Sequence, residues 1–309
     1  MNLRVLLATD LSRCAESATR LTASLPWPKS TTILVLGVIE TARPVVDVGR
    51  SAGTDERDAR EFTYAVRLVS ETLAAPGRTV ETITTFGHPA DAIVEEAARF
   101  RADLVIMGSR GRGPVRSALL GSVSAEVVDR APCPVLIARR ERISSVVFGA
   151  DGETRTAVAA DVLAWPIFAD VPIRVVTVAN VHLPYGAAAE SRAKFDAAVS
   201  SYLKKTSEED TRCDRIAKQR AAQLTALGVR ATSEVRHGPP AKAILATADA
   251  FGADLIVVGS RGDRGLHRMV VGSTAREILY EASCSVLIAR QQPAAELDEM
   301  AAFAIGYAS

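Results

Sequence analysis

The chain has 309 residues, a length that accommodates two domains of ordinary size. Its 37 Lys and Arg residues nearly balance 36 Asp and Glu residues, so a net charge of +1 gives no electrostatic argument for binding nucleic acid or an anionic membrane. No apolar run reaches the length of a transmembrane helix, and the first ten residues lead into a predicted strand instead of a signal peptide. We therefore expect a cytoplasmic protein.

Taken in chain order, the first half alternates apolar runs with helical patterns. The runs at residues 3–9, 31–39 and 78–86 predict strands, and the patterns at residues 12–24, 54–75 and 90–100 predict helices. A further strand, a Gly-rich loop, a helix and a final strand follow within residues 103–139. Five strands separated by four helices are typical of a doubly wound parallel sheet.

The second half repeats this order, with strands expected at residues 146–150, 173–178 and 230–236 and a helical region at about 188–227. Asp151 follows Asp10 by 141 residues, whereas Gly238 follows Gly87 by 151, so ten residues were added between the first and third strands of this half. The 181–213 region is the expected place for them. A longer solvated helix or loop is favoured there over a segment that covers a ligand or binds a partner.

These elements predict an α/β protein with two tandem, Rossmann-like, five-stranded parallel-sheet domains. The charged run at residues 139–142 separates them, which gives domains of residues 1–141 and 142–309, the second carrying the insertion and a tail after Arg290. The four cysteines, Cys14, Cys133, Cys213 and Cys284, lack C-x-x-C spacing and clustered histidines, so we expect no bound metal.

The 103–139 stretch recurs at 254–290 with 16 identities in 37 positions. Its glycines stay in register, Gly108, Gly111 and Gly121 in the first copy matching Gly259, Gly262 and Gly272 in the second. Several backbone N–H groups can converge on a phosphate where no Cβ atoms interfere, and a helix N-terminus adds free amides and a positive dipole. Neither a P-loop nor a strand followed by G-x-G-x-x-G is present. An ordinary turn remains the alternative, but two copies with one spacing disfavour it.

Several residues near these loops have two possible roles. Ser122 and Ser273 can cap their own helices or bind a phosphate oxygen. Asp10 and Asp151, directly after the first strand of each half, can accept from a ribose hydroxyl or an adenine amine, or cap the following helix. Val38 and Val178 can contact a base or belong to the core.

The pattern G-x2-G-x9-G-[ST] resembles the nucleotide-binding motif of the universal stress proteins. ATDLS after the first strand, GHPAD and HGPPA before the third helices, and the APCPVLIA strand also resemble that family. The likeness covers nearly all of both halves, so the chain is similar to a tandem member of this fold group, which is nucleotide-α-hydrolase-like. In the family the fifth strands pair across a dimer, which implies that residues 135–138 and 286–289 pair within this chain as an intramolecular pseudo-dimer.

The resemblance implies ATP as the ligand, with Mg²⁺ as a possible companion and ADP or AMP as alternatives. Its adenine would lie near Asp10 and Val38 and its phosphates over the glycine loop. The first site is expected to comprise Ala8, Thr9, Asp10, Val38, Met107, Gly108, Arg110, Gly111, Arg112, Gly113, Gly121, Ser122 and Val123. The second is expected to comprise Ala150, Asp151, Val178, Val258, Gly259, Arg261, Gly262, Gly265, Gly272, Ser273 and Thr274. Pro114 departs from the family pattern, in which many members carry the glycine that Gly265 retains.

The two loops differ in charge, because Arg112 in the first is replaced by Asp263 in the second. Two units of charge beside a triphosphate are worth about 1 kcal/mol at a partly exposed site, which predicts tighter ATP binding in the first half.

The leading hypothesis is an ATP-binding stress-response or signalling module that acts on a protein partner not identified by the sequence. The sequence contains no P-loop lysine, no carboxylate pair for two metals and no clear arginine finger, which argues against efficient hydrolysis. A slow ATPase or ATP-using enzyme, a nucleotide-free scaffold, and pairing of two chains into a homodimer stay open.

Overall fold

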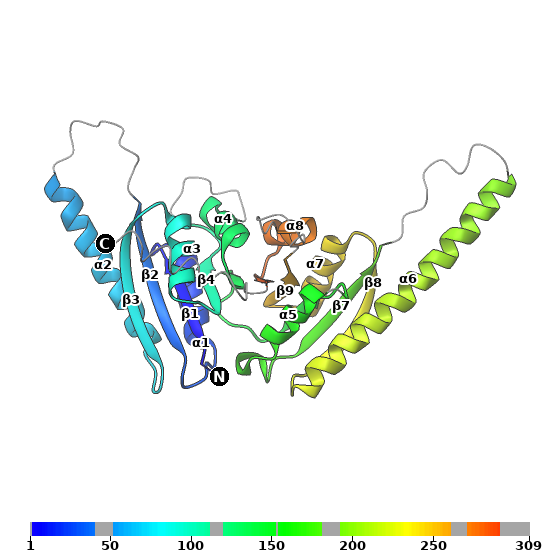
Figure 1. Ribbon diagram of the computed structural model, residues 1–309, viewed down its shortest axis with the longest axis horizontal. Coiled ribbons are helices and arrows are strands. Elements are labelled where there is room, and N and C mark those ends of the chain that lie inside the picture. The colour runs from blue at the N-terminus through cyan, green and yellow to red at the C-terminus, as the bar shows by residue number, and fades with distance from the viewer. Residues whose placement is uncertain are drawn as a thin grey trace, which may run out of the picture. The chain divides into compact units, whose positions relative to one another are not determined.

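The computed structural model describes residues 2–40, 52–111, 120–152, 154–180, 192–260 and 271–290. These residues form ten strands, eight α-helices and one 3-10 helix (Figure 1). The elements are β1 (Arg4–Thr9), α1 (Arg13–Ser24), β2 (Thr32–Glu40), α2 (Ala52–Leu73), β3 (Thr79–Gly87), α3 (Pro89–Arg99), β4 (Leu104–Gly108), α4 (Ser122–Arg130), β5 (Val135–Ala138), β6 (Val146–Gly149), α5 (Thr154–Leu163), η1 (Pro166–Phe168), β7 (Ile173–Ala179), α6 (Arg192–Ala226), β8 (Ala231–His237), α7 (Pro240–Phe251), β9 (Leu255–Gly259), α8 (Ser273–Glu281) and β10 (Ser285–Ala289).

The chain divides into two compact units that differ from the repeats in sequence. Unit 1 comprises Met1–Ile143 and Ser260–Ser309, and unit 2 comprises Ser144–Gly259. The last helix and strand of the second repeat, α8 and β10, therefore belong to the same compact unit as the whole first repeat.

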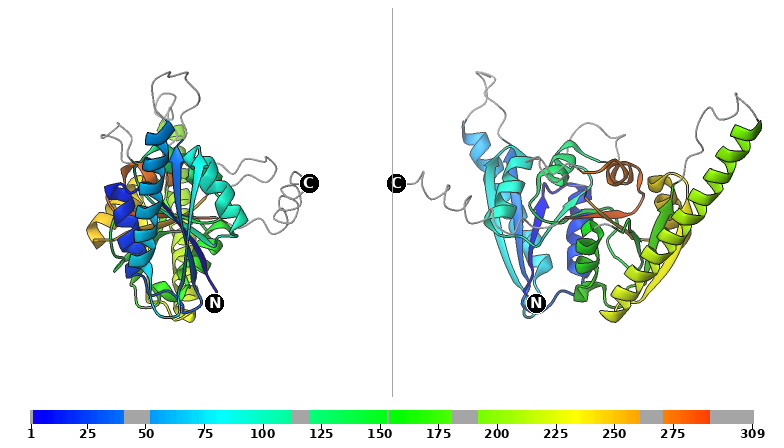
Figure 2. Two further views of the ribbon diagram at one scale, coloured as in Figure 1. Left: turned by 90° about the vertical axis from the view of Figure 1, so that its left-hand side faces the viewer. Right: turned by 45° about the vertical axis from the view of Figure 1, so that its right-hand side comes forward.

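In unit 1 the strands follow the order β3-β2-β1-β4-β5-β10. The first five are parallel and have the doubly wound arrangement predicted from the sequence. The side chains of β1 after Arg4 and all those of β4 are buried, which explains why both segments read as continuous apolar runs. Helices α1 and α2 pack against each other on one face of this sheet, and α3 and α4 pack together on the other (Figure 2).

In unit 2 the strands follow the order β9-β6-β7-β8, all parallel. Helix α6 has 35 residues, whereas α2 at the equivalent position has 22. Among the described side chains of α6, from residue 199 onward, the buried ones begin at Cys213 and continue through Ala217 to Leu224, so this C-terminal part packs against its unit. The expected additional residues thus lengthen this helix; residues 181–191 of the predicted insertion lie outside the described part of the chain, as does the tail after Arg290.

The pairing expected between the fifth strands of the two repeats is present within unit 1. Strands β5 and β10 are antiparallel, with Leu136 opposite Leu287 and Val135 opposite Ile288. Every side chain of both strands is buried. This pairing places the ends of the matching VLIAR segments beside the helices of the opposite repeat.

Each VLIAR arginine binds the C-terminal carbonyls of the other repeat's helix. Arg290, which is 3% exposed, donates to Ala131 O at 2.6 Å, to Asp129 O at 3.4 Å and to Val128 O, all at the end of α4. Cations are favourable at a helix C-terminus, where carbonyls lack intrahelical partners. Burial lowers the pKa of Arg290 below its ordinary value, but these contacts compensate the buried guanidinium.

Arg139 makes the reciprocal contact at the end of α8. Its guanidinium donates to Leu279 O at 2.6 Å and to Cys284 O at 3.3 Å, and its backbone N–H donates to Ser285 Oγ at 3.1 Å. Burial is the main cause of the lowered pKa of Arg139. The two repeats are therefore joined by reciprocal contacts of a buried arginine, Arg290, and a half-buried one, Arg139, as well as by the strand ladder.

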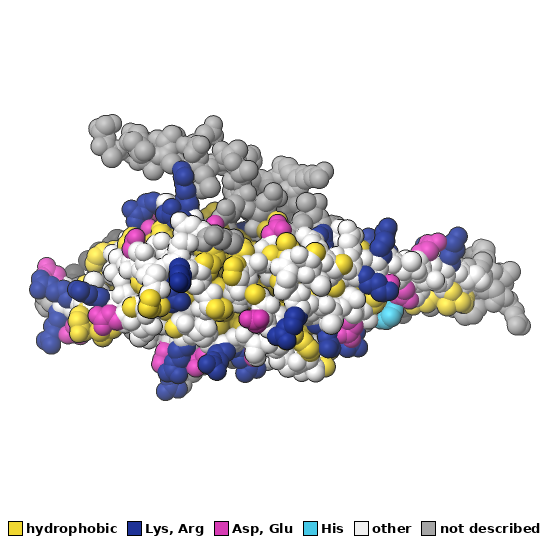
Figure 3. Space-filling view, turned by 90° about the horizontal axis from the view of Figure 1, so that it is seen from below, with side chains coloured by type: hydrophobic (Ala, Val, Ile, Leu, Met, Phe, Trp, Pro, Cys, Tyr) yellow, Lys and Arg dark blue, Asp and Glu magenta, His cyan; other side chains and the backbone are white. Residues whose placement is uncertain are grey.

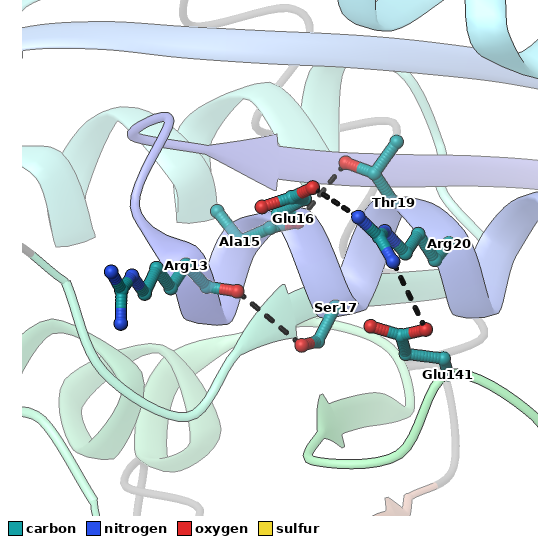
Figure 4. A network of polar contacts seen from close by, with 7 residues as sticks. All are labelled: Arg13, Ala15, Glu16, Ser17, Thr19, Arg20 and Glu141. Carbon is teal, nitrogen blue, oxygen red and sulfur yellow. Dashed lines mark hydrogen bonds and ion pairs between the residues drawn. The ribbon is translucent and has the colours of Figure 1, made fainter.

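An exposed ion-pair network connects α1 to the segment that follows β5 (Figure 4). Arg20 lies 2.5 Å from Glu16 on its own helix and 3.4 Å from Glu141. All three side chains are at least half exposed, so solvent screening leaves this network only a small contribution to stability.

Candidate functional site

The predicted residues of the first site that the structure describes lie at the carboxyl ends of β1, β2 and β4 and at the start of α4. These strands are neighbours, and Ala8 in β1 is the register partner of Met107 in β4. Ala8, Thr9 and Met107 are each 6% exposed, so their side chains are buried beneath the carboxyl edge of the sheet and do not face solvent. The chain then leaves both strands at the same level, which brings Asp10 and the loop after Gly108 together.

Asp10 lies directly against Gly111. A Cβ atom on Gly111 would come within 2.6 Å of Asp10 Oδ2, a distance that no real Cβ contact tolerates without movement. The other carboxylate oxygen, Oδ1, accepts a hydrogen bond from the backbone N–H of Ser12 at 3.1 Å. Two residues that are 101 positions apart in the sequence thus share one wall of the candidate site.

Ser12 holds the start of α1 and the Gly-rich loop together. Its hydroxyl accepts from Ala15 N at 3.3 Å as the N-cap of the helix and donates to Arg110 O at 3.2 Å. The residue before it, Leu11, has a left-handed backbone with φ of 61°, which is costly for a branched side chain. This sharp turn directs the chain from β1 into α1 beside the loop.

Gly108 and Ser124 attach the start of the Gly-rich loop to the two neighbouring helices. A Cβ atom on Gly108 would lie 2.6 Å from the carbonyl carbon of Cys14 and 2.8 Å from Ala15 N, so only glycine lets the first turn of α1 approach β4. The buried hydroxyl of Ser124, on α4, donates to Gly108 O at 3.0 Å. The loop is therefore attached to both helices that flank it.

The N-terminus of α4 lies beside this loop and has no side-chain cap. Gly121 is the N-cap residue, has no side-chain cap bond, and donates its own N–H to Ser109 O at 2.8 Å. Ser122 is the first helical residue and is exposed, while Val123 is half-buried. Of the two roles considered for Ser122, capping of its own helix is thus not the one this geometry shows. The same holds for Ser273, which is exposed and follows the N-cap residue Gly272.

Val38 lies near the end of β2, the strand beside β1, and is half-buried. It therefore retains some surface at the carboxyl edge of the sheet, unlike Leu36 two positions earlier, which is fully buried. Arg110 is half-buried at the start of the loop, and Gly111 is exposed. Arg112, Gly113 and Pro114 lie outside the described residues, as do Arg261, Gly262, Asp263 and Gly265 of the second loop.

The residues predicted for the second site are divided between the compact units. In unit 2, Ala150 and Asp151 follow β6, Val178 is half-buried in β7, and Val258 and Gly259 end β9. In unit 1, Gly272, Ser273 and Thr274 begin α8. Asp151 is exposed, whereas Asp10 is half-buried. The residue after it is Gly152 with φ of 80°, so the left-handed turn of Leu11 recurs where glycine adopts it without strain.

The sequence did not assign Ser12 and Ser124 to the site. Ser12 marked only the start of a helix, and its bond to Arg110 O joins residues 98 positions apart. Ser124 had no distinguishing signal, because a buried serine in a helix reads as an ordinary small residue. Cys133 and Cys284 are buried just before β5 and β10, and desolvation raises the pKa of the Cys133 thiol to about 12.

Charge is dispersed on one face of the molecule. On the face drawn in Figure 3, basic and acidic side chains are interspersed, in keeping with the small net charge of the chain. The described residues contain no group of three or more His, Cys, Asp or Glu side chains placed to hold a metal ion. No helix within the described ranges is long and apolar enough to cross a membrane.

The fold places the chain in a definite class, that of α/β proteins in which one polypeptide carries two copies of a doubly wound domain. The sequence model of the universal stress protein family matches residues 1–139 and again residues 143–290. The chain therefore belongs to the universal stress protein family, a family of stress-response proteins, as a tandem member.

Individual relatives agree with this assignment. A universal stress protein of Thermus aquaticus is 36% identical over 136 residues, which covers 44% of this chain and 97% of that protein. A universal stress protein of Mycobacterium tuberculosis is 29% identical over 247 residues, or 74% of this chain and 75% of its own length. Among solved structures, a universal stress protein from Archaeoglobus fulgidus superposes with a TM-score of 0.65 over 93% of this chain and 98% of that one. At 20% identity, this last likeness supports the fold alone.

Proposed function

We propose that the protein binds an adenine nucleotide at the carboxyl ends of β1 and β4 and acts as a nucleotide-dependent stress-response module. ATP, accompanied by Mg²⁺, is the proposed ligand, with ADP and AMP as related ones. The observation that carries this proposal is the contact between Asp10 and Gly111, because it joins a carboxylate suited to a ribose with a loop suited to phosphates. The cytoplasm is the proposed compartment.

The Asp10 half of the site is built to receive a nucleoside. Ligands of doubly wound sheets bind at the carboxyl ends of the strands, and a carboxylate placed there can accept hydrogen bonds from ribose hydroxyls. The Ser12 N–H bond to Oδ1 fixes the orientation of this carboxylate, so Oδ2 stays beside Gly111. Val38 offers a half-buried apolar surface on the neighbouring strand, which suits the edge of an adenine ring.

The loop and α4 supply groups for the phosphates. The first amides of α4 have no side-chain acceptor at Gly121, and the helix dipole favours an anion there. The exposed hydroxyl of Ser122 can donate to a phosphate oxygen. The half-buried Arg110 adds positive charge at the start of the loop. These features support phosphate binding without supplying groups for rapid hydrolysis.

We further propose that the first repeat binds ATP more tightly than the second. Asp10 is half-buried and held by Ser12, while Asp151 is exposed and is followed by Gly152 and Glu153 in place of Leu11 and Ser12. The opposite charges of Arg112 and Asp263 act in the same direction. Titration of Gly111→Val and Gly262→Val variants tests this asymmetry, and equal residual affinity in the two variants would contradict it.

The proposed function is tested first by identifying the ligand. The purified protein is denatured, and released nucleotide is identified by mass spectrometry. If the protein purifies without bound nucleotide, ATP and Mg²⁺ are added and the Tm is measured by thermal unfolding. We expect released adenine nucleotide or a rise in Tm on addition of ATP; neither nucleotide release nor a thermal shift would leave the scaffold hypothesis in its place.

A matched pair of variants then locates the site. Asp10→Asn keeps an acceptor for Ser12 N but replaces the second carboxylate oxygen, the proposed acceptor for the ribose, by an amide NH2 group. The affinity for ATP should therefore fall about tenfold or more. Glu141→Gln removes the same charge at an exposed position in the same unit and should leave affinity unchanged. Equal effects of the two variants would mean that charge, and not the ribose contact, governs binding.

A further inference from the structure

The sheet of unit 1 ends at β3, and the described residues place no strand on the far side of it (Figure 1). β3 pairs with β2 through nine register positions, from Thr79 to Gly87. Natural edge strands are commonly protected by proline, lysine, a bulge or shortness. β3 contains no proline and no lysine, and Glu81 is its one charged residue. Among the described residues, β3 is therefore a long edge strand that no further strand covers.

The hydrogen bond at the start of β3 determines which of its backbone groups face outward. Thr79 N donates to Thr31 O at 3.1 Å, so Thr79 faces β2. Because the backbone groups of a strand alternate, every second residue from Thr79 also faces β2. The residues whose N–H and C=O groups face away from β2 are Val80, Thr82, Thr84 and Phe86.

We propose that β3 pairs antiparallel with β3 of a second copy of this chain, with Ile83 opposite Ile83 on the two-fold axis. In this register Val80 of one copy lies opposite Phe86 of the other, and Thr82 lies opposite Thr84. Each of the four outward-facing residues then exchanges both backbone hydrogen bonds with its partner, about eight bonds across the interface. This is the register in which all nine residues of the two strands overlap.

The side chains of β3 suit this self-pairing. Phe86 is 62% exposed although it is aromatic, and the register places it beside β-branched Val80 of the second copy. Thr82 meets Thr84, which is a favourable cross-strand pair. Glu81 lies opposite Thr85, so no like charges meet. The same interface therefore covers the exposed Phe86 and avoids electrostatic repulsion.

The edge strand of unit 2 lacks this self-complementarity. β8 is seven residues long, and full antiparallel overlap with a second β8 would place Glu234 opposite Glu234. Like charges directly opposite each other destabilise a strand pair. Glu234 is also engaged by Arg236 at 2.5 Å and Arg174 at 3.4 Å within its own unit. Since β5 already pairs with β10 inside the chain, β3 is the strand edge best suited to a second copy.

Disulfide cross-linking tests the register of this dimer. Ile83 forms a non-hydrogen-bonded pair in the proposed interface, with Cα atoms about 4.5 Å apart, within the range of a disulfide. Ile83→Cys in a Cys14→Ser background should therefore give an oxidised dimer on a non-reducing gel. Glu81→Cys in the same background is the control, because its copies would lie four residues out of register, about 14 Å apart. Cross-linking of both variants alike, or of neither, would overturn the proposal.

Sedimentation measures the same interface without a cross-link. Thr82→Pro removes an outward N–H from β3 but no bond to β2, and Ser233→Pro makes the equivalent change on β8. Thermal unfolding establishes that each variant is folded. We expect a dimer for the unmodified chain, association weakened by about tenfold or more for Thr82→Pro, and an unchanged dimer for Ser233→Pro. A monomeric unmodified chain, or equal effects of the two prolines, would contradict pairing through β3.

Discussion

Replacing Arg290 by methionine tests the claim that its buried guanidinium joins the two repeats. The change retains an unbranched side chain but removes bonds to the carbonyls of Val128, Asp129 and Ala131 at the end of α4. Hydrogen bonds to a charged donor contribute about 1.5–3 kcal/mol each, and the variant recovers part of the desolvation cost of the guanidinium. We expect a net loss of about 3 kcal/mol in the free energy of unfolding. For a unit of this size the corresponding fall in Tm is about 6–12 °C.

Differential scanning calorimetry compares the Tm of Arg290→Met with that of a control variant, Arg276→Met. Arg276→Met removes the 2.9 Å ion pair between Arg276 on α8 and Asp129 on α4, but the Arg276 side chain is 44% exposed. Its loss should cost about 0–1 kcal/mol. Arg139→Met should resemble Arg290→Met, because it makes the reciprocal contact at the end of α8. A Tm for Arg290→Met as high as that of Arg276→Met would refute this reasoning.

Three further predictions concern the first repeat. Ser12→Ala should lower the free energy of unfolding in urea by about 1 kcal/mol, through loss of the N-cap of α1, and an unchanged midpoint would contradict the capping role. Gly108→Ala should cost about 1–3 kcal/mol by thermal unfolding, because its Cβ meets the backbone of Cys14; a Tm equal to that of the unmodified protein would show that α1 can move away. Burial raises the pKa of Cys133 to about 12 from 9.0, so its contribution to stability is full below pH 9 and is lost as pH rises toward 12. Cys133→Ala should therefore lose stability less steeply above pH 9 in equilibrium unfolding, and an identical slope would argue against a protonated buried thiol.

The sequence predicted the fold because its signals are local and repeated. Continuous apolar runs identified the buried parallel strands, and the recurrence of VLIAR in both halves, together with the family resemblance, led to the pairing of β5 with β10. The glycine spacing and the position of Asp10 after its strand placed Asp10 and Gly111 at the carboxyl edge of the first sheet. The structure brings Asp10 and Gly111 into direct contact, as a shared site requires.

Other features depend on contacts that no local pattern encodes. Arg290 reads as a charged residue that ends a strand, and only the antiparallel pairing shows that it is buried against α4. The bond from Ser12 to Arg110 O joins distant segments whose proximity follows from strand order. The compact units also divide the chain differently from its repeats, because α8 and β10 are placed by tertiary packing and not by sequence similarity.

The central claim is that Asp10 and Gly111 form one wall of a nucleotide site, and calorimetric titration with ATP and Mg²⁺ tests it most directly. Gly111→Ala would place a Cβ atom 2.6 Å from Asp10 Oδ2 and so displace the carboxylate, while leaving the strands of the sheet intact. We expect the unmodified protein to bind ATP and Gly111→Ala to lose about tenfold or more in affinity at the first site. A Gly111→Ala variant that binds ATP as tightly as the unmodified protein, or an unmodified protein that gives no binding heat, would contradict the account.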